Sequence, residues 1–233
     1  MTLHLRDHAL LNEPRPFRSL LAQPGVVEQL QLRSSVGFMA IHGGHLEEMT
    51  DWVAREAAER SGASYYAVVQ PPEDQWHIPS HLIGRDPSPR LETFLEHVEV
   101  VVSLHGFGRP ELWRSLLLGG RNRQVAEMVA IELIPRLRHY EIITELKGIP
   151  KALRGQHRLN PVNLPRMGGV QIELPPRVRG RSPIFWGQLE PGTIVPHLEA
   201  LVEGLAAFAQ RWSLGDARLK APDASLSSRR QSA

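Results

Sequence analysis

Unbroken apolar runs alternate with amphipathic stretches along most of the chain. Runs rich in β-branched residues predict buried strands, whereas apolar residues recurring at helical spacing predict helices. We predict two strands within 26–44, the second ending at His42, and further strands within 64–71, 99–107, 112–120, 140–146 and 169–176. Helices are predicted over 47–62, 88–98, 122–138 and 195–212. Strands that alternate with helices favour an α/β protein, a single-domain three-layer sandwich with a mixed, mostly parallel sheet.

The chain has the length and composition of one globular domain. Its 233 residues are 42% hydrophobic and 22% charged, which allows a substantial core. We expect an irregular segment over 1–25, the domain over 26–213 and a polar, flexible tail over 214–233. No window approaches the roughly 20 apolar residues of a membrane span, and the N-terminus does not resemble a signal peptide. A cytoplasmic location without a membrane partner is therefore the expectation.

The charged and metal-binding residue types narrow the chemistry. The chain has no cysteine, so a metal would need histidine or carboxylate ligands. The only lysines are Lys147, Lys151 and Lys220, so all the other residues counted as Lys or Arg are arginine. Arginine binds carboxylates through two points, which suggests an anionic substrate, although a bias of the genome explains the same composition.

Three predicted strands end in a metal-capable or acid–base side chain, namely His42, His105 and Glu173. In open α/β sheets the ligand crevice lies outside the carboxyl ends of the strands, so these side chains can meet. Each histidine is followed by a glycine, Gly43 or Gly106, which lets the backbone turn sharply. The pattern indicates a site at this edge of the sheet.

The chemistry of a catalytic zinc gives a reason for this set. Such a zinc has three histidine or carboxylate ligands and a water, and a separate carboxylate takes the proton of the water. His42, Glu47 and His105 are the candidate ligands, and Glu173 is the candidate general base. Each residue alone has a structural explanation, such as a glutamate that complements a helix dipole. The hypothesis depends on all four occurring together.

A second histidine pattern is a weaker metal signal. His77 and His81 lie four residues apart, as in a helical zinc pair. Pro79 lies between them, and the glutamate of the metalloprotease motif is missing. We therefore do not predict a metal pair here, although a substrate contact from this loop is plausible.

Four segments, AIHGGHLEEMT, VSLHGF, LLLGGRNR and NPVNLPRMGGVQIEL, together resemble the poly-γ-glutamate hydrolase family of phages and bacteria. The resemblance spans residues 35–179, most of the chain. It implies a zinc amidase with a fold like the core of the zinc carboxypeptidases. It also implies zinc ligands at His42, Glu47 and His105, with Glu173 as the base.

One departure from the family concerns the substrate. Relatives usually carry an Asn-Arg pair that resembles the substrate-carboxylate clamp of carboxypeptidases, but here Leu164 follows Asn163. Arg166, two residues later, is the candidate replacement. The other candidate substrate-binding residues are Asn160, Asn163, Arg121 and Gln171.

The leading hypothesis is therefore zinc-dependent hydrolysis of γ-glutamyl or related amide bonds, in an anionic polymer or a small amide substrate. One alternative is a zinc deacylase or peptidase acting on small N-acyl amino acids or cell-wall peptides. Another is a non-catalytic protein that binds anions or nucleic acid. Nucleic acid is an unlikely partner because Arg229 and Arg230 of the tail add little affinity. The oligomeric state is open, and so is the ion, since imidazole also binds other divalent metals.

Overall fold

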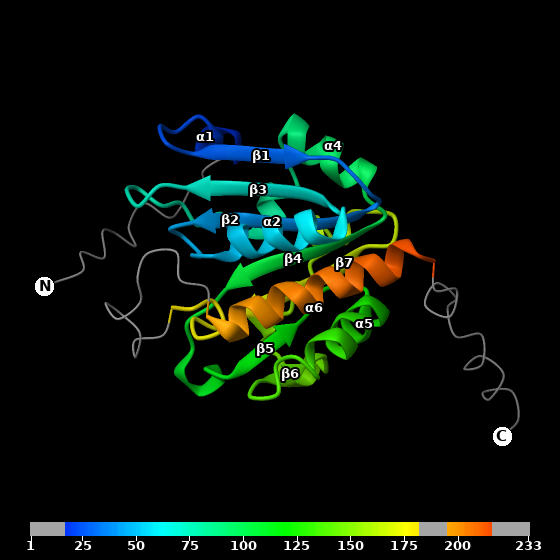
Figure 1. The fold of residues 1–233 in the computed structure, drawn as a ribbon. Coiled ribbons are helices and arrows are strands. Elements are labelled where there is room, and N and C mark those ends of the chain that lie inside the picture. The colour runs from blue at the N-terminus through cyan, green and yellow to red at the C-terminus, as the bar shows by residue number, and fades with distance from the viewer. Residues whose placement is uncertain (1–16, 182–194, 216–233) are drawn as a thin grey trace, which may run out of the picture.

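The computed structural model describes residues 17–181 and 195–215. Its centre is a seven-stranded sheet with the strand order β1-β3-β2-β4-β7-β5-β6 (Figure 1). The strands are β1 (Val27–Gln31), β2 (Val36–Gly44), β3 (Ser64–Gln70), β4 (Val100–Gly106), β5 (Ser115–Leu118), β6 (Glu141–Ile143) and β7 (Gly169–Leu174). The α-helices are α1 (Phe17–Leu21), α2 (Thr50–Ser61), α3 (Ser80–Ile83), α4 (Pro89–His97), α5 (Arg123–Leu133) and α6 (Pro196–Ser213). Short 3-10 turns are η1 (Pro110–Leu112), η2 (Leu146–Gly148), η3 (Lys151–Leu153) and η4 (Pro161–Asn163).

The sheet is mixed and mostly parallel, as predicted. The pairs β2–β3, β2–β4, β4–β7 and β5–β6 are parallel, and the pairs β1–β3 and β5–β7 are antiparallel. Alternate residues of β2 face opposite sides of the sheet: Phe38 and Ala40 pack with α2 and α6, whereas Met39 and Ile41 pack with α1 and α4. Both faces are therefore covered, which explains the continuous apolar runs of the strands. The predicted three-layer arrangement is confirmed.

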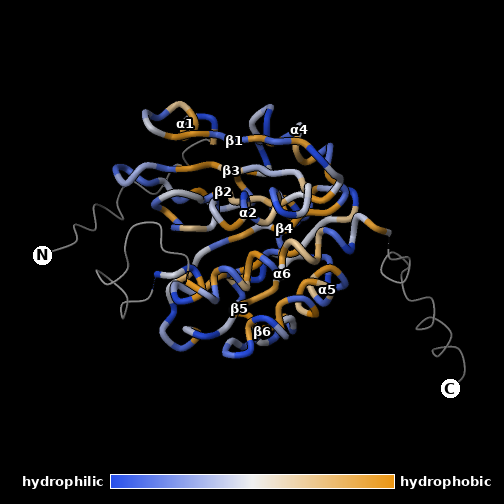
Figure 2. Tube along the Cα trace, in the orientation of Figure 1, coloured by the Kyte–Doolittle hydropathy of each residue, from blue (hydrophilic) through white to orange (hydrophobic). Residues whose placement is uncertain are grey.

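Two of the helices, α4 and α5, begin directly after a residue whose side chain caps the helix. Ser88 Oγ accepts a hydrogen bond from Leu91 N at 3.0 Å, and Pro89 occupies the first position of α4. Asn122 caps α5 in the same way through Val125 N at 3.0 Å. Hydrophobic and hydrophilic residues alternate along α5 and α6, as in amphipathic helices packed on a sheet (Figure 2).

The turn after β2 differs from the prediction. We predicted a helix from Glu47, but α2 begins at Thr50. Glu47 N instead donates to His42 O at 3.0 Å, which closes a turn between the strand and the helix. Gly44 adopts a φ of +72°, and a Cβ at this residue would lie 2.2 Å from Gln70 O. Only glycine therefore fits this turn, and the turn moves Glu47 out of the helix.

Other elements are also shorter than predicted, among them α5, which ends at Leu133, and two short helices, α1 and α3, were not predicted. The strands predicted at 112–120 and 140–146 contract to β5 and β6, and the loop-rich region 147–168 contains only 3-10 turns. Within the segment 1–25, expected to be irregular, α1 buries Phe17 and Leu20 against the sheet. The packed part thus begins before residue 26, while 1–16 and the tail 216–233 lie outside the described residues. No helix of the described ranges has the length and hydrophobicity to cross a membrane.

Candidate metal centre

Three neighbouring parallel strands bring the predicted site residues to one edge of the sheet. His42 lies near the end of β2, His105 near the end of β4 and Glu173 near the end of β7. His105 and Glu173 are direct partners in the register of β4 and β7. The residues His42, His105 and Glu173 are 2%, 3% and 4% exposed. Parallel pairing therefore places residues far apart in sequence in one buried cluster.

The carboxylate of Glu47 links the two histidines. Its Oε1 lies 3.0 Å from His42 Nδ1, and its Oε2 lies 3.3 Å from His105 Nδ1. The backbone N–H of Gly106 also donates to Oε2 at 3.0 Å. Two imidazole nitrogens of the same kind thus face one buried carboxylate.

The other ring nitrogens of these histidines have partners outside the cluster. His42 Nε2 lies 2.9 Å from the carbonyl oxygen of Ile78, and His105 Nε2 lies 3.1 Å from Ser103 Oγ. Metal-ligating histidines commonly fix one ring nitrogen in this way and present the other to the ion. The residue types and the pairing of His42, Glu47 and His105 therefore suit a divalent metal, which these side chains would hold.

The charges of the cluster support the same fit. Burial raises the pKa of Glu47, but His42 and His105 outweigh burial and hold this pKa well below its usual range. Burial lowers the pKa of His105, but Glu47 outweighs it, so this pKa is raised. A buried anion of this kind needs a positive charge beside it. A bound cation supplies that charge when the histidines are neutral.

Glu173 is held by a chain of buried amides. Gln171 Nε2 donates to Glu173 Oε1 at 2.8 Å, and Asn160 Nδ2 donates to Gln171 Oε1 at 2.8 Å. Burial, with a further contribution from Glu47, raises the pKa of Glu173 to about 7. A carboxyl group with such a pKa is suited to accept and release a proton near neutral pH.

The sequence comparison decides the family. Residues 19–185 match the family described as Poly-gamma-glutamate hydrolase. The chain belongs to this family. The recognition from the four sequence motifs is thereby confirmed, and the chain is a hydrolase of the family that acts on amide bonds.

Solved structures share the fold of this hydrolase. The structure of a bacteriophage poly-gamma-glutamate hydrolase matches with a TM-score of 0.69 and 18% identity, over 84% of this chain and 95% of that chain. A structure described as the zinc-free apo form of YNDL matches with a TM-score of 0.64 and 24% identity, over 80% of this chain and 90% of that chain. No curated protein matches the chain.

Two of the predicted substrate-binding residues of the hydrolase support Glu173 instead. Asn160 and Gln171 are each 4% exposed, and both belong to the amide chain that ends on Glu173. Asn160 Oδ1 also accepts a hydrogen bond from Val162 N at 3.2 Å. Their side-chain hydrogen bonds are thus directed at Glu173 and at the loop that contains Val162.

Asn163 and Arg121 are joined to each other. Asn163 Oδ1 accepts from Arg121 N at 2.9 Å, and Asn163 Nδ2 donates to Gly155 O at 2.7 Å. The backbone next to Arg121 bonds to Gly169 at the first position of β7, whereas Glu173 lies near its last. Asn163 therefore stabilises the loop that contains it. The backbone of Arg121 lies near the first residue of β7, at the end of this strand opposite to Glu173.

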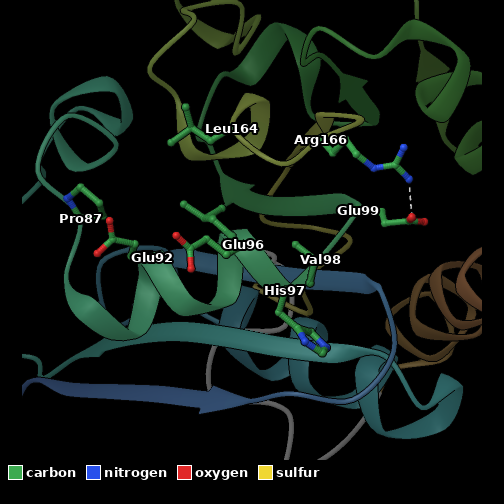
Figure 3. Close-up of a pocket in the computed structure, with 9 residues that line it drawn as sticks. Pro87, Glu92, Glu96, His97, Val98, Glu99, Leu164 and Arg166 are labelled. Atoms are coloured by element: carbon green, nitrogen blue, oxygen red, sulfur yellow. Dashed lines mark hydrogen bonds and ion pairs between the residues drawn. The ribbon is translucent and has the colours of Figure 1, made fainter.

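The structure places Arg166 away from the candidate metal centre, so its predicted role as a replacement clamp gains no support. Arg166 forms an ion pair with Glu99, the residue before β4, whereas His105 lies near the end of that strand. Figure 3 shows this pair at a pocket of about 390 Å³ that also includes Glu92 and Glu96 of α4. The pocket lies at the opposite end of β4 from the candidate metal centre.

Two residues near the centre, His77 and Arg179, were not among the candidate metal ligands or the candidate base. His77 offers a ligand atom within 4.8 Å of those of His42 and Glu47, whereas His81 instead faces the ring of His157, with centroids 4.6 Å apart. Arg179, 8% exposed, donates to Glu48 O at 2.6 Å and to Leu174 O at 3.2 Å. The only sequence signal for His77 was the metal-type spacing that Pro79 made us set aside.

Proposed function

We propose that this chain hydrolyses γ-glutamyl amide bonds of an anionic polymer. In this proposal His42, Glu47 and His105 hold a zinc ion, and Glu173 is the general base. The observation that carries it is the convergence of two Nδ1 atoms on the Glu47 carboxylate, beside a second buried carboxyl group with a pKa of about 7. The family membership supports the choice of bond and substrate.

The reaction divides between the ion and the protein. When bound, zinc supplies a water of lowered pKa and polarises the carbonyl of the scissile amide. Glu173 takes the proton of the attacking water and returns it to the nitrogen of the leaving amine. Gln171 fixes Oε1 of this carboxyl, so Oε2 is the oxygen that carries the proton. The products are a carboxylate and a free amine.

The substrate is tested with a panel of polymers and small amides. We expect the zinc-loaded protein to shorten poly-γ-glutamate, and not an α-linked polyglutamate of equal length, because only the γ-linked chain has the bond of the family. Size-exclusion chromatography and titration of new amines measure this. Cleavage of N-acyl amino acids with the polymer intact would favour the deacylase. Binding of nucleic acid without any hydrolysis would favour the non-catalytic protein.

Gln171 gives a test of the amide chain. Gln171→Leu removes the donor to Glu173 Oε1 while keeping a side chain of similar size. We expect kcat to fall about 10- to 100-fold, as is usual for partners that orient a reacting group, with no loss of metal. Turnover assays and elemental mass spectrometry measure both quantities. The control is Gln210→Leu, whose amide donates a hydrogen bond to Arg60 O on the surface of the helix layer. Unchanged kcat in Gln171→Leu would rule out the orienting role.

A further inference from the structure

The loop between β3 and α3 brings a third histidine to the metal centre. The ring centroid of His77 lies 4.7 Å from that of His42, at an interplanar angle of 42°. His42, Glu47 and His77 each offer a ligand atom, and these atoms lie within 4.8 Å of one another. His77 therefore lies beside His42 and Glu47, within reach of an ion that these two residues would hold.

The backbone on both sides of His77 is anchored. Gln70 at the end of β3 accepts from Trp76 N at 2.8 Å and donates to Trp76 O at 3.1 Å. On the other side, Ile78 is 3% exposed, and its carbonyl oxygen bonds to His42 Nε2 at 2.9 Å. The residues before and after His77 are thus fixed to the sheet and to a candidate ligand. The position of His77 beside the centre is built into the fold.

The candidate ligands His105 and His77 differ in burial, and therefore in how easily each could leave a metal ion. His105 is 3% exposed, and its Nε2 is held by Ser103. His77 is exposed to solvent, although its ring lies against that of His42. A catalytic zinc keeps one position for water or substrate beside its three protein ligands. A ligand in that fourth position must be able to leave, and an exposed side chain can do so.

We propose that His77 is a fourth, displaceable ligand of the metal in the substrate-free hydrolase. It occupies the position that water and substrate take during turnover, while His42, Glu47 and His105 remain bound. This inference rests on the proposed function, because it requires the metal at those three residues. In the absence of substrate, the loop between Pro71 and Pro79 then covers the metal through His77.

The test uses the full chain loaded with Co²⁺, whose visible absorption bands report the ligands of the ion. We compare the wild type with His77→Ala and with His81→Ala, which removes an imidazole four residues further along. We expect the bands of His77→Ala to shift and its affinity for Co²⁺, measured by competition with a chelator, to fall at least about tenfold. His81→Ala should match the wild type, because its ring faces His157.

The outcomes separate this inference from the proposed function. A His105→Ala variant is measured in parallel. If it loses Co²⁺ while His77→Ala keeps the bands and affinity of the wild type, the metal centre stands and the role of His77 as a ligand is overturned. If His77→Ala binds Co²⁺ as the wild type does but has a raised KM, the ring of His77 contributes to substrate binding. If the wild type itself binds no Co²⁺ or Zn²⁺, both proposals fall. Far-UV circular dichroism checks that each variant is folded.

Discussion

Glu173→Gln is expected to keep its metal and to lose turnover, with kcat reduced on the order of 10²- to 10⁴-fold. Glutamine has the size of glutamate and still accepts the hydrogen bond of Gln171, but it cannot take a proton from water. The position at the end of β7, beside His105, is otherwise unchanged. Steady-state kinetics on poly-γ-glutamate and elemental mass spectrometry on the same sample measure the two quantities.

The control for this variant is Glu145→Gln, an exposed glutamate between β6 and η2. It changes the same functional group at an exposed position outside the buried cluster, so both kcat and metal content should stay within about twofold of the wild type, as is general for surface substitutions. If Glu173→Gln retains the activity of the wild type, Glu173 is not the base.

His105→Ala is expected to lose both the metal and all activity. The substitution removes one of the two Nδ1 atoms that face Glu47 and leaves the buried carboxylate with a single imidazole partner. About one zinc per wild-type chain, absent from the variant, is the expected result of elemental mass spectrometry. A ligand present at 1,000 times its Kd stabilises the folded state by about 4 kcal/mol, so a chelator should lower the Tm of the wild type and leave that of the variant unchanged.

His97→Ala is the matched control for this experiment. His97 ends α4, where its Nε2 lies 3.1 Å from Arg33 O, well away from the cluster. This variant should keep its zinc. A wild type that stays free of metal after zinc is supplied and excess is dialysed away would leave Gly43 and Gly44 with only a structural role. The non-catalytic binding protein would then be the better explanation.

The sequence could predict that the candidate ligands meet at one edge of the sheet, because their meeting follows from the direction of the strands. His42 and His105 each terminate an apolar run, and neighbouring parallel strands end at the same edge. Alternate residues of a strand lie on the same face, so Gln171 and Glu173 share one face of β7, and the two are hydrogen-bonded. Such local rules need only the hydrophobic pattern.

What the sequence did not reveal depends on how loops return to the sheet. Arg166 is two residues from Leu164, but the loop carries it to Glu99 at the other end of β4. His77 reaches the centre only because Gln70 and Ile78 anchor its loop. Spacing along the chain contains no information about either path, since both are set by hydrogen bonds between distant residues.

The position of β7 has a consequence for the order in which the enzyme is assembled. β7 is the last strand of the described sequence, yet it lies between β4 and β5 inside the sheet. A growing chain that has not reached Gly169 thus leaves the facing edges of both strands without a partner, and such edges invite pairing with other chains. Synthesis of His42, Glu47 and His105 is complete long before that of Glu173. The nascent protein therefore holds its candidate metal ligands before it holds its candidate base, and it becomes an enzyme only when its final strand inserts.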